Sequence, residues 1–558
     1  MSEETTADKN YRLQDPEIDR LKKYGEVRSH QEGDILFAPG DQEIDFLVIL
    51  SGQLDVVLEE NGDEVRVGWL EPKQFTGDVG LITRQRSRFL GRMAIEGEVL
   101  HVSPEQLRQL LVADTELSDI LVSTFIARRA WQRAENKASA VLVGHSLDRD
   151  AFTIRDLLSR HSIPHLWIEI ENEDQATPVL DRIGLTVDDA PILILGANVY
   201  LKKPTIAEVS ETLGLNLLPE SACADVVVVG AGPAGLASSV YAASEGLSVV
   251  TIDGMAPGGQ AGTSSKIENY LGFPSGISGR DLADRASVQA QKFGARIAAP
   301  VTADELVTED DAYVLKLKDG RQLNARAVII ATGADYRRLP IDNLEDYEGR
   351  GVYYGATAME AQICQGSRVA IVGAGNSAGQ GAVFLSKSAQ DVHVFYRRAN
   401  IRDTMSEYLV TRLEQTPNIH LHPESEITGI DGCENRIRSL RMSSPDGPAT
   451  LDANFLFLFI GAAPCSDWLP SSVARDEKGF IKTGPTIANL DLVRASWSLD
   501  RMPTLFETSL PRVYAVGDVR SGSVKRVASG VGEGSIVIQF VHQAISEASR
   551  AKAADQSQ

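Results

Sequence analysis

The sequence predicts a multidomain chain in which an N-terminal β-roll is followed by α/β domains. Short alternating strands separated by glycine turns fill residues 12–135. A β-α-β-α-β-α order fills residues 138–217. Two separate strand–glycine-loop–helix units follow within residues 223–550. The length of 558 residues, 43% of them hydrophobic, is sufficient for several packed cores.

Charge and cysteine content narrow the classes of function. The net charge of −22 argues against a nucleic-acid-binding protein. The first ten residues are polar, and the longest apolar runs, such as Phe455 to Ala463, are too short to cross a bilayer. No C-x-x-C pair occurs among Cys223, Cys364, Cys433 and Cys465. We therefore expect a cytoplasmic protein without a nucleic-acid or membrane partner and without a metal site.

The first glycine loop has the features of a dinucleotide-binding site. It follows the predicted strand Asp225–Val229, runs Gly230-Ala-Gly232-Pro-Ala-Gly235, and opens the predicted helix Leu236–Ser244. The glycines allow a pyrophosphate to approach the backbone, and the helix N-terminus supplies free N–H donors. Asp253 closes the next strand, where an acid can bond ribose hydroxyls.

A second loop, Gly373-Ala-Gly375-Asn-Ser-Ala378, follows the predicted strand Val369–Val372. The next predicted strand, Asp391–Phe395, ends in arginines rather than in an acid. Tyr396-Arg397-Arg398 stands there, with Arg402 close behind, and arginines at this point would bind a 2′-phosphate. This pattern favours NADPH over NADH, whereas the alternative is a solvated basic patch.

Residues 223–550 resemble the low-molecular-weight thioredoxin reductases. The motifs that carry the resemblance are Gly258-Gly259-Gln260, Glu268-Asn269-Tyr270, Ala331-Thr332-Gly333, Gly461-Ala-Ala-Pro464, Tyr514-Ala-Val-Gly517-Asp518 and Arg526-Val527-Ala528, in the order that the family has them. The resemblance implies Rossmann-like FAD and NADPH domains, with the NADPH domain (347–475) inserted between two parts of the FAD domain (223–346 and 476–550). It also implies a homodimer.

The site residues follow from the loops and from this resemblance. For FAD they are Gly230, Gly232, Pro233, Ala234, Gly235, Asp253, Gly259, Gln260, Asn269, Ala331, Thr332, Gly333, Gly517, Asp518, Arg526, Val527 and Ala528. For NADPH they are Gly373, Gly375, Asn376, Ser377, Ala378, Tyr396, Arg397, Arg398, Arg402 and Gly461.

The redox cysteine pair of that family has no counterpart here. Where the family has C-A-T-C followed by an acid, this chain has Ala356-Thr357-Ala358-Met359-Glu360. Neither Ala356 nor Met359 can form a thiolate or a disulfide. Cys364 lies five residues further on, where it is expected to pack as a small hydrophobe. Electrons must then pass to another acceptor, for which a thioredoxin-like protein, a ferredoxin-type carrier, a quinone-like molecule and oxygen are the candidates.

Residues 138–217 resemble a glutaredoxin or thioredoxin fold without its cysteines. The loop after the first strand, His145 to Asp150, contains none. Pro191 stands where that fold has a cis-proline, so a cis peptide bond is expected, the alternative being an ordinary proline at a strand start. We interpret the region as an adaptor or docking surface.

Residues 12–135 resemble a cyclic nucleotide-binding domain. Gly77 and Asp78 match its phosphate-cradle segment, in which the acid accepts from a ribose hydroxyl and an arginine binds the cyclic phosphate. Arg84, Arg86 and Arg88 are all near, and the spacing favours Arg88. The resemblance implies a nucleotide ligand, whereas the alternative is a β-roll retained for packing or dimerisation.

Three functional hypotheses follow. The first is an NADPH-dependent FAD oxidoreductase with an external acceptor, and the second is a flavin-based sensor or scaffold without turnover. The third is a thioredoxin-disulfide reductase that uses other thiols, either of this chain, with Cys223 and Cys465 as candidates, or of a partner. Separately, His420 and His422 alternate on a predicted strand, where a solvated strand face is more common than a metal pair and no third ligand is evident nearby.

Overall fold

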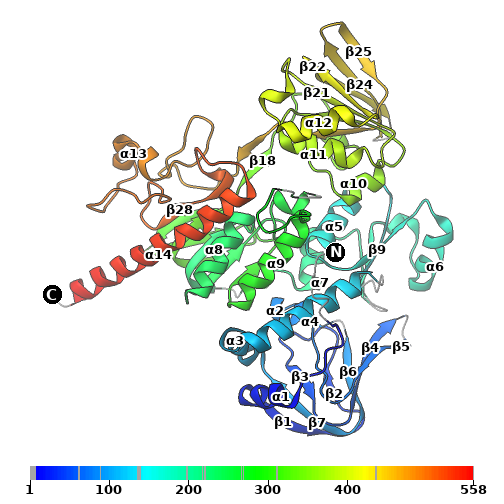
Figure 1. Cartoon of the computed structure of the whole chain (residues 1–558), viewed down its shortest axis with the longest axis vertical. Helices are drawn as coiled ribbons and strands as arrows, with labels where there is room; N and C mark the ends of the chain where they lie inside the picture. Colours follow the sequence, from blue (N-terminus) through cyan, green and yellow to red (C-terminus); the bar gives the residue numbers. More distant parts are fainter. Residues whose placement is uncertain are drawn as a thin grey trace.

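The computed structural model describes residues 8–60, 63–87, 89–134, 140–195, 199–216, 218, 221–264, 267, 269–309, 312–433 and 436–556. Figure 1 shows an elongated molecule with the β-roll at one end and the sheet that contains β20–β22 at the other. A larger parallel sheet and the long helix α14 lie between these two ends.

The N-terminal part of the chain folds into two small antiparallel sheets with helices at one end. One sheet has the order β1-β7-β3 and the other β2-β6-β4-β5. The strands are β1 (Glu26–His30), β2 (Ile35–Phe37), β3 (Phe46–Ile49), β4 (Gln53–Glu60), β5 (Asp63–Leu70), β6 (Leu90–Ile95) and β7 (Gly97–Val102). The helices are α1 (Asp15–Leu21), α2 (Val79–Thr83), α3 (Pro104–Ala113) and α4 (Thr115–Ala134). The helical region from Pro104 is divided into two helices, because Asp114 ends α3 and its Oδ1 accepts the Leu117 N–H at 3.1 Å.

Residues 140–213 form a separate four-stranded sheet of order β11-β10-β8-β9. Its elements are β8 (Ala140–Gly144), α5 (Arg149–Arg160), β9 (His165–Glu169), α6 (Glu173–Ile183), β10 (Ile192–Ile194), β11 (Tyr200–Lys202) and α7 (Ile206–Leu213). The Ala190–Pro191 bond is cis, as expected. Strand β11 is additional to the expected β-α-β-α-β-α order, and Pro178 lies inside α6 rather than in its first turn.

The central sheet has the order β14-β13-β12-β17-β16-β15, with β28 beside β17. The mutually parallel strands are β12 (Ser221–Val229), β13 (Val249–Ile252), β14 (Arg296–Ala298), β17 (Gln322–Ile330) and β28 (Val513–Ala515). Strand β16 (Ala312–Leu317) pairs antiparallel with both of its neighbours, β17 and β15 (Ala303–Glu309). Helices α8 (Pro233–Ser244), α9 (Gly279–Lys292) and α14 (Val527–Gln556) belong to this part, and α13 (Asn489–Arg494) lies on the segment before β28.

A second parallel sheet is inserted into the central one. The chain leaves after β17 through β18 (Ala334–Tyr336) and returns through β27 (Ala462–Pro464), and these two strands pair with each other. The inserted sheet has the order β19-β26-β20-β21-β22. Its elements are β19 (Val352–Tyr353), α10 (Ala358–Ile363), β20 (Arg368–Val372), α11 (Asn376–Leu385), β21 (Asp391–Tyr396), α12 (Glu407–Gln415), β22 (Ile419–Pro423) and β26 (Phe455–Leu458). A small antiparallel sheet of β23 (Glu426–Cys433), β24 (Arg436–Ser444) and β25 (Gly447–Leu451) packs beside it.

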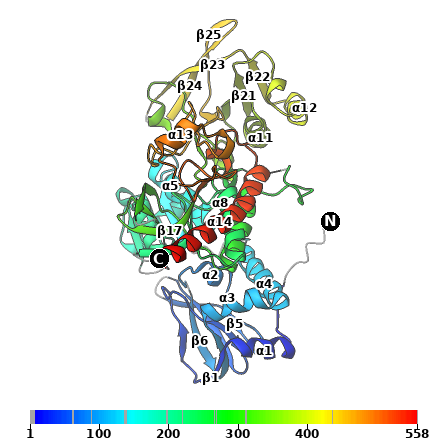
Figure 2. The ribbon, with the colours of Figure 1, turned by 90° about the vertical axis from the view of Figure 1, so that its left-hand side faces the viewer.

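Helices α8 and α14 lie side by side because glycines let their backbones approach closely (Figure 2). A Cβ atom on Gly534 would lie 2.1 Å from the carbonyl oxygen of Ala234. Gly530, one turn earlier, also faces Ala234. The N-terminus of α14 is therefore held next to that of α8.

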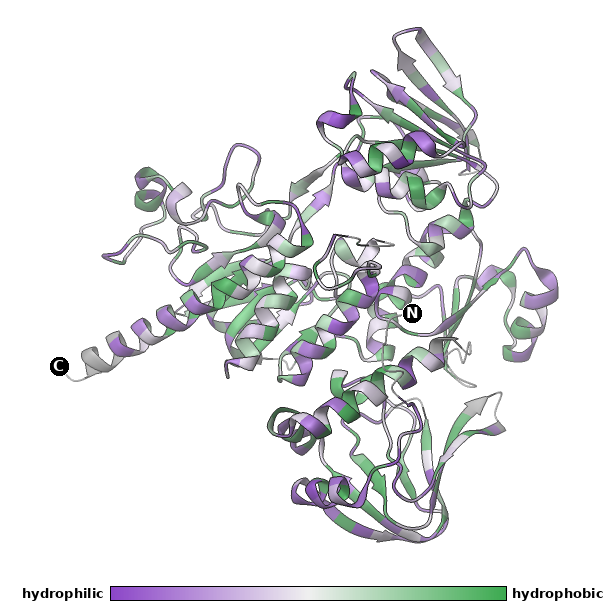
Figure 3. Cartoon of the chain, viewed as in Figure 1, coloured by the Kyte–Doolittle hydropathy of each residue, from purple (hydrophilic) through white to green (hydrophobic). Residues whose placement is uncertain are grey.

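Hydrophobic residues gather on the strands at the centre of each sheet, as Figure 3 shows, and polar residues lie on the outer faces of the helices. Within the described part of the chain, no helix combines the length and the apolar character needed to cross a bilayer.

A buried ion pair ties the segment before β28 together. The Arg501 guanidinium donates to both carboxylate oxygens of Glu507, at 2.6 and 3.1 Å, and the Glu507 side chain is 0% exposed. We expect Arg501→Met to lower the free energy of unfolding by about 3–5 kcal/mol, because it leaves a buried carboxylate without its cation.

Chemical denaturation of the purified protein checks this. The matched control is Arg441→Met, which removes the exposed pair of Arg441 with Asp431 and should cost less than about 1 kcal/mol. Equal losses for the two variants would contradict the assignment.

Candidate cofactor site

A cavity of about 710 Å³ opens where the parallel strands of the central sheet end. Residues at the carboxyl ends of β12, β13 and β17 line it, as expected of ligand sites in open α/β sheets. The N-terminal residues of three helices also line it, namely Pro233 of α8, Ser377 of α11 and Val527 of α14. Helix N-termini carry free N–H donors and partial positive charge, so the cavity is suited to anionic phosphates.

The first glycine loop is shaped by contacts that exclude a side chain. Gly230 has φ +107°, and a Cβ atom there would lie 2.3 Å from the Ala331 carbonyl oxygen. A Cβ atom on Gly235 would lie 1.8 Å from the carbonyl oxygen of Gly230. The loop therefore closes tightly between β12, β17 and α8, which leaves the cavity side open to a ligand.

Asp253 at the end of β13 holds the same loop from the other side. Its carboxylate accepts N–H groups of Ala231 at 2.8 Å, Met255 at 2.9 Å and Ala256 at 3.1 Å. Burial raises its pKa above the usual value despite these bonds. A carboxylate so placed both orders the loop and offers its remaining lone pairs to the cavity.

Asp518 lines the cavity next to the start of α14. Burial raises its pKa, and Lys525 opposes that shift. The preceding Gly517 donates its N–H to Glu533 of α14 at 2.7 Å, and Glu533 also pairs with Arg520. The Gly517–Asp518 turn is thereby fixed to the helix whose N-terminus faces the cavity.

Most of the residues predicted for FAD line this cavity; three do not. Gly235 lies beneath the loop, Asn269 is exposed, and Ala528 is exposed in the first turn of α14. Gln260 donates its side-chain amide to the Ala334 carbonyl. Sequence reasoning missed further lining residues: Arg160, Thr263, Asp335, Cys465, Trp468 and Lys525. None of them belongs to a motif, and Arg160 comes from α5, in residues 140–213, which form the sheet of β8–β11.

The second glycine loop faces the same cavity through Ser377. A Cβ atom on Gly373 would lie 2.5 Å from the Phe459 carbonyl oxygen, whereas one on Gly375 would meet nothing within 4 Å. The Asn376 side chain accepts the Ser406 N–H at 2.7 Å, which fixes the first turn of α11. Ala378 is buried in the core of the inserted sheet, and Gly461 is exposed just before the return strand β27.

The arginines after β21 differ in availability. The side chains of Arg397 and Arg398 are 84% and 59% exposed and have carboxylates only at 3.9 Å. Arg402 instead donates to both oxygens of Glu414 at 2.9 Å. The Tyr396 side chain beside them is buried. Arg397 and Arg398 can therefore take a phosphate without breaking a close ion pair, whereas Arg402 cannot.

The segment that the resemblance places at the family's cysteine pair, residues 356–360, begins beside the cavity. Gly355 faces Thr263, a cavity residue, with its Cβ position 3.5 Å from the Thr263 Oγ1. Ala356 is buried in the core of the inserted sheet. Met359 is in α10, and its side chain lies outside the described part of the structure. Burial raises the pKa of Cys364 to about 12, as suits a packed thiol.

Cys465 is the one cysteine that lines the cavity among the residues that the structure describes. Burial, reinforced by Asp335, raises the pKa of its thiol to about 12. Such a group is protonated at neutral pH and is a poor nucleophile. Cys223 lines a different cavity, at the amino ends of β12 and β13.

The β-roll segment predicted to bind a nucleotide is occupied by an internal pair. Asp78 caps α2 by accepting the Gly80 N–H at 2.7 Å, and Arg129 of α4 contacts its carboxylate at 3.2 Å. Gly77 has φ +102°, and Arg88 lies outside the described residues. Arg129 lines a cavity of about 310 Å³ together with residues of α9 and with residues that follow or end the helices α5 and α7.

One cavity bounded by two dinucleotide loops, three helix N-termini and a buried acid defines a flavin- and pyridine-nucleotide-dependent oxidoreductase. The volume and the phosphate-binding geometry fit FAD. The chain belongs to the pyridine nucleotide-disulphide oxidoreductase family, which matches residues 224–548, more than half of its length. Residues 27–114 match the cyclic nucleotide-binding domain family.

Several similar proteins are named thioredoxin reductases. NADPH-dependent thioredoxin reductase 3 of Arabidopsis thaliana is 30% identical over 360 residues, which are 61% of this chain and 64% of that protein, so the match covers less than two thirds of the plant relative. Thioredoxin reductase of Bacillus subtilis is 28% identical over 325 residues, 58% of this chain and 95% of the relative.

Solved structures of thioredoxin reductases have the same fold as this part of the chain. Those of the thioredoxin reductases from Lactococcus lactis (25% identity) and T. acidophilum (27% identity) each superpose with a TM-score of 0.51, covering 58% of this chain and 99% of theirs. The predicted enzyme class, its fold over this region and its cofactor pair, FAD and NADPH, are thereby confirmed.

Two glycines separate the roles of the loops. We expect Gly235→Ala to abolish flavin binding, because the new Cβ would overlap the Gly230 carbonyl, and Gly375→Ala to keep the flavin. The flavin absorbance per chain after purification checks this. Retention of flavin by Gly235→Ala would show that the loop does not close as described.

The thiol of Cys465 gives a second prediction. With its pKa raised to about 12, the group stays protonated as pH rises through neutrality and beyond. We expect no long-wavelength thiolate–flavin absorbance between about pH 6 and pH 9, and the same spectra for Cys465→Ser. A band that titrates in this range in the wild type and vanishes in Cys465→Ser would contradict the assignment.

Proposed function

We propose that this protein is an NADPH-dependent FAD oxidoreductase that works without an internal dithiol and passes electrons to an external acceptor. The observation that carries the proposal is the shared cavity, which residues of both glycine loops line. The raised pKa of the Cys465 thiol supports the proposal, as does the burial of Ala356, which the resemblance places at one of the two family cysteine positions.

The residues have separable tasks. When bound, FAD and NADPH supply hydride transfer, which is the chemistry of the cofactors themselves. Asp253 and the loop from Gly230 to Gly235 position one dinucleotide, and Arg397 and Arg398 select the other by its 2′-phosphate. Ser377 brings the second loop to the wall of the first site.

We assign residues 138–217 to a thioredoxin-like unit that bridges the two cofactor sheets. Its α5 contacts both: His161 bonds the Met255 carbonyl at 3.1 Å in the central part, and Arg155 donates to Gln362 of α10 at 3.3 Å. The ring of Phe152 packs on the ring of Tyr353 in the inserted part, with the ring centroids 5.5 Å apart. Motion between the two sheets would have to break these contacts, so the unit acts as an adaptor that restrains it.

We propose that the β-roll, residues 12–135, responds to a nucleotide, as its family match favours. A ligand carboxylate or phosphate at Gly77 and Asp78 would compete for Arg129, which now holds Asp78. Because Arg129 lines a cavity with α9, the change would reach the FAD-binding part directly. The ligand acts only through unequal affinity for the two states.

A homodimer is also proposed. Exposed apolar side chains lie around α13 and the segment after it, where Leu490, Val493, Leu499, Met502 and Leu505 gather. Apolar groups in such number mark an interaction surface.

The proposed electron acceptor is an external redox protein of thioredoxin or ferredoxin type, or a small oxidant. The second candidate function is a thioredoxin-disulfide reductase with partner-supplied thiols, which the names of the relatives favour.

Anaerobic rapid mixing of the flavoprotein with NADPH tests the proposal. We expect the flavin to bleach rapidly with NADPH. Arg398→Ala should raise the half-saturating NADPH concentration about tenfold or more but leave that for NADH unchanged, because a charge-assisted bond to phosphate is lost.

The matched control is Arg441→Ala, an exposed arginine of β24 that should change neither constant. A flavin that stays oxidised for minutes under saturating NADPH would favour the sensor without turnover and overturn the proposal.

A further inference from the structure

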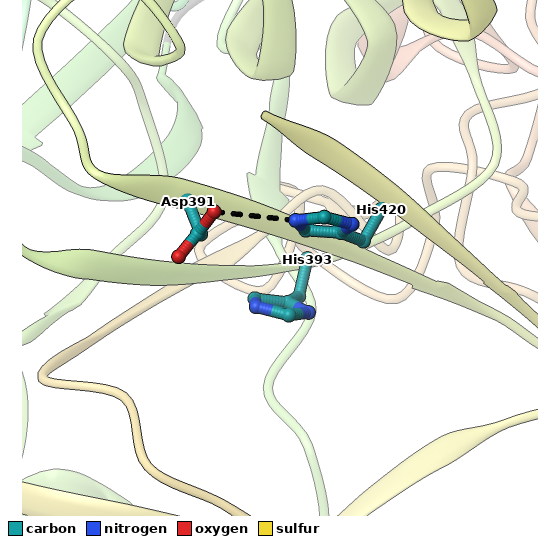
Figure 4. A group of neighbouring side chains, drawn as sticks. All are labelled: Asp391, His393 and His420. Carbon is teal, nitrogen blue, oxygen red and sulfur yellow. Dashed lines mark hydrogen bonds and ion pairs between the residues drawn. The ribbon is translucent and has the colours of Figure 1, made fainter. Parts of the chain in front are cut away.

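Four side chains outside the cofactor cavity converge on one face of the inserted sheet. Strands β21 and β22 are parallel neighbours, and their register pairs His393 with His420. Because side chains alternate along a strand, Asp391 and His393 of β21 share a face, and so do His420 and His422 of β22. Figure 4 shows Asp391, His393 and His420 gathered in this way.

The donor atoms are close enough to share one ion. The Nε2 atom of His420 lies 3.2 Å from Oδ1 of Asp391, and one ligand atom from each of Asp391, His393 and His420 lies within 4.8 Å of the others. Ligand atoms at zinc-type bond lengths of about 2.0–2.2 Å in tetrahedral geometry are separated by about 3.3–3.5 Å. The Asp391–His420 pair, at 3.2 Å, is close to that spacing, and a small side-chain rotation would bring His393 into range.

The fourth side chain orients the third ligand. His422 Nε2 lies 3.0 Å from His393 Nδ1, and the Phe395 and His422 rings stack with centroids 4.5 Å apart. A hydrogen bond to one imidazole nitrogen fixes the tautomer and leaves the other nitrogen free to bind a metal.

The surroundings leave the carboxylate available. Arg368 of β20 approaches the other oxygen of Asp391, Oδ2, at 3.5 Å, so Oδ1 is the atom that faces His420. Imidazole nitrogen with carboxylate oxygen is the donor set that zinc and its neighbours in the first transition row prefer.

We propose that Asp391, His393 and His420 bind a divalent transition-metal ion of the zinc class, with His422 as a positioning residue. Such an ion would link the edge strand β22 to the amino-terminal half of β21. The site does not depend on the redox function proposed above.

Zinc and cobalt titrations of the full-length flavoprotein, stripped of metal by a chelator, test the proposal. We expect about one Zn²⁺ per chain by calorimetry and visible ligand-field bands with Co²⁺. His420→Ala removes an exposed ligand and should weaken zinc binding about tenfold or more. Asp391→Asn, which keeps the shape of the side chain, should also weaken it.

His145→Ala is the matched control, since His145 is an exposed histidine that has one carboxylate partner, Glu171, at 3.2 Å. The His145→Ala variant should bind zinc as the wild type does. Zinc should raise the thermal midpoint of the wild type and of His145→Ala, but not that of His420→Ala. Unchanged zinc affinity in both His420→Ala and Asp391→Asn would overturn the proposal, since exposed Cys223 and Cys433 remain in each and would then account for the binding.

Discussion

The close packing of the loop Gly230–Gly235 between β12, β17 and α8 is the constraint on which the rest of the structure depends. The Gly230 carbonyl occupies the space that a Gly235 side chain would need, and Asp253 accepts three backbone N–H groups around the same loop. This arrangement sets the start of α8, and α8 in turn positions α14 through the contact of Gly534 with Ala234. The cavity, with its helix N-termini, is the consequence.

We propose that the chemistry of the cavity differs from that of the related thioredoxin reductases, and two neighbouring features support this proposal. Ala356, which the resemblance places at one of that family's redox cysteines, is buried, and burial raises the pKa of the Cys465 thiol. Neither can pass electrons onward as a thiolate. What remains is a flavin site to which the middle unit contributes Arg160, so that a domain without redox cysteines has a place in the cofactor site itself.

The sequence predicted the parts of the site that depend on local backbone geometry. The glycines of both loops and Asp253 could be recognised because a tight turn and a strand-ending acid are local requirements. Three features could not be recognised from the sequence, because they arise where distant elements meet. They are the position of Arg160 on the cavity, the position of Ser377 on the same cavity, and the Asp78–Arg129 pair. The proposed ligands Asp391 and His393 were not recognised beside His420 for the same reason: Asp391 lies 29 residues before His420, and both reach it only through the pairing of β21 with β22.

The absence of a working dithiol is the central claim, and counting electrons tests it most directly. An anaerobic reductive titration of the wild-type flavoprotein should end at about one two-electron equivalent per flavin, because the flavin alone accepts electrons. An end point near two equivalents per flavin, retained at neutral pH and lost when Cys223, Cys364, Cys433 and Cys465 are all replaced by serine, would show a redox-active disulfide and contradict the account.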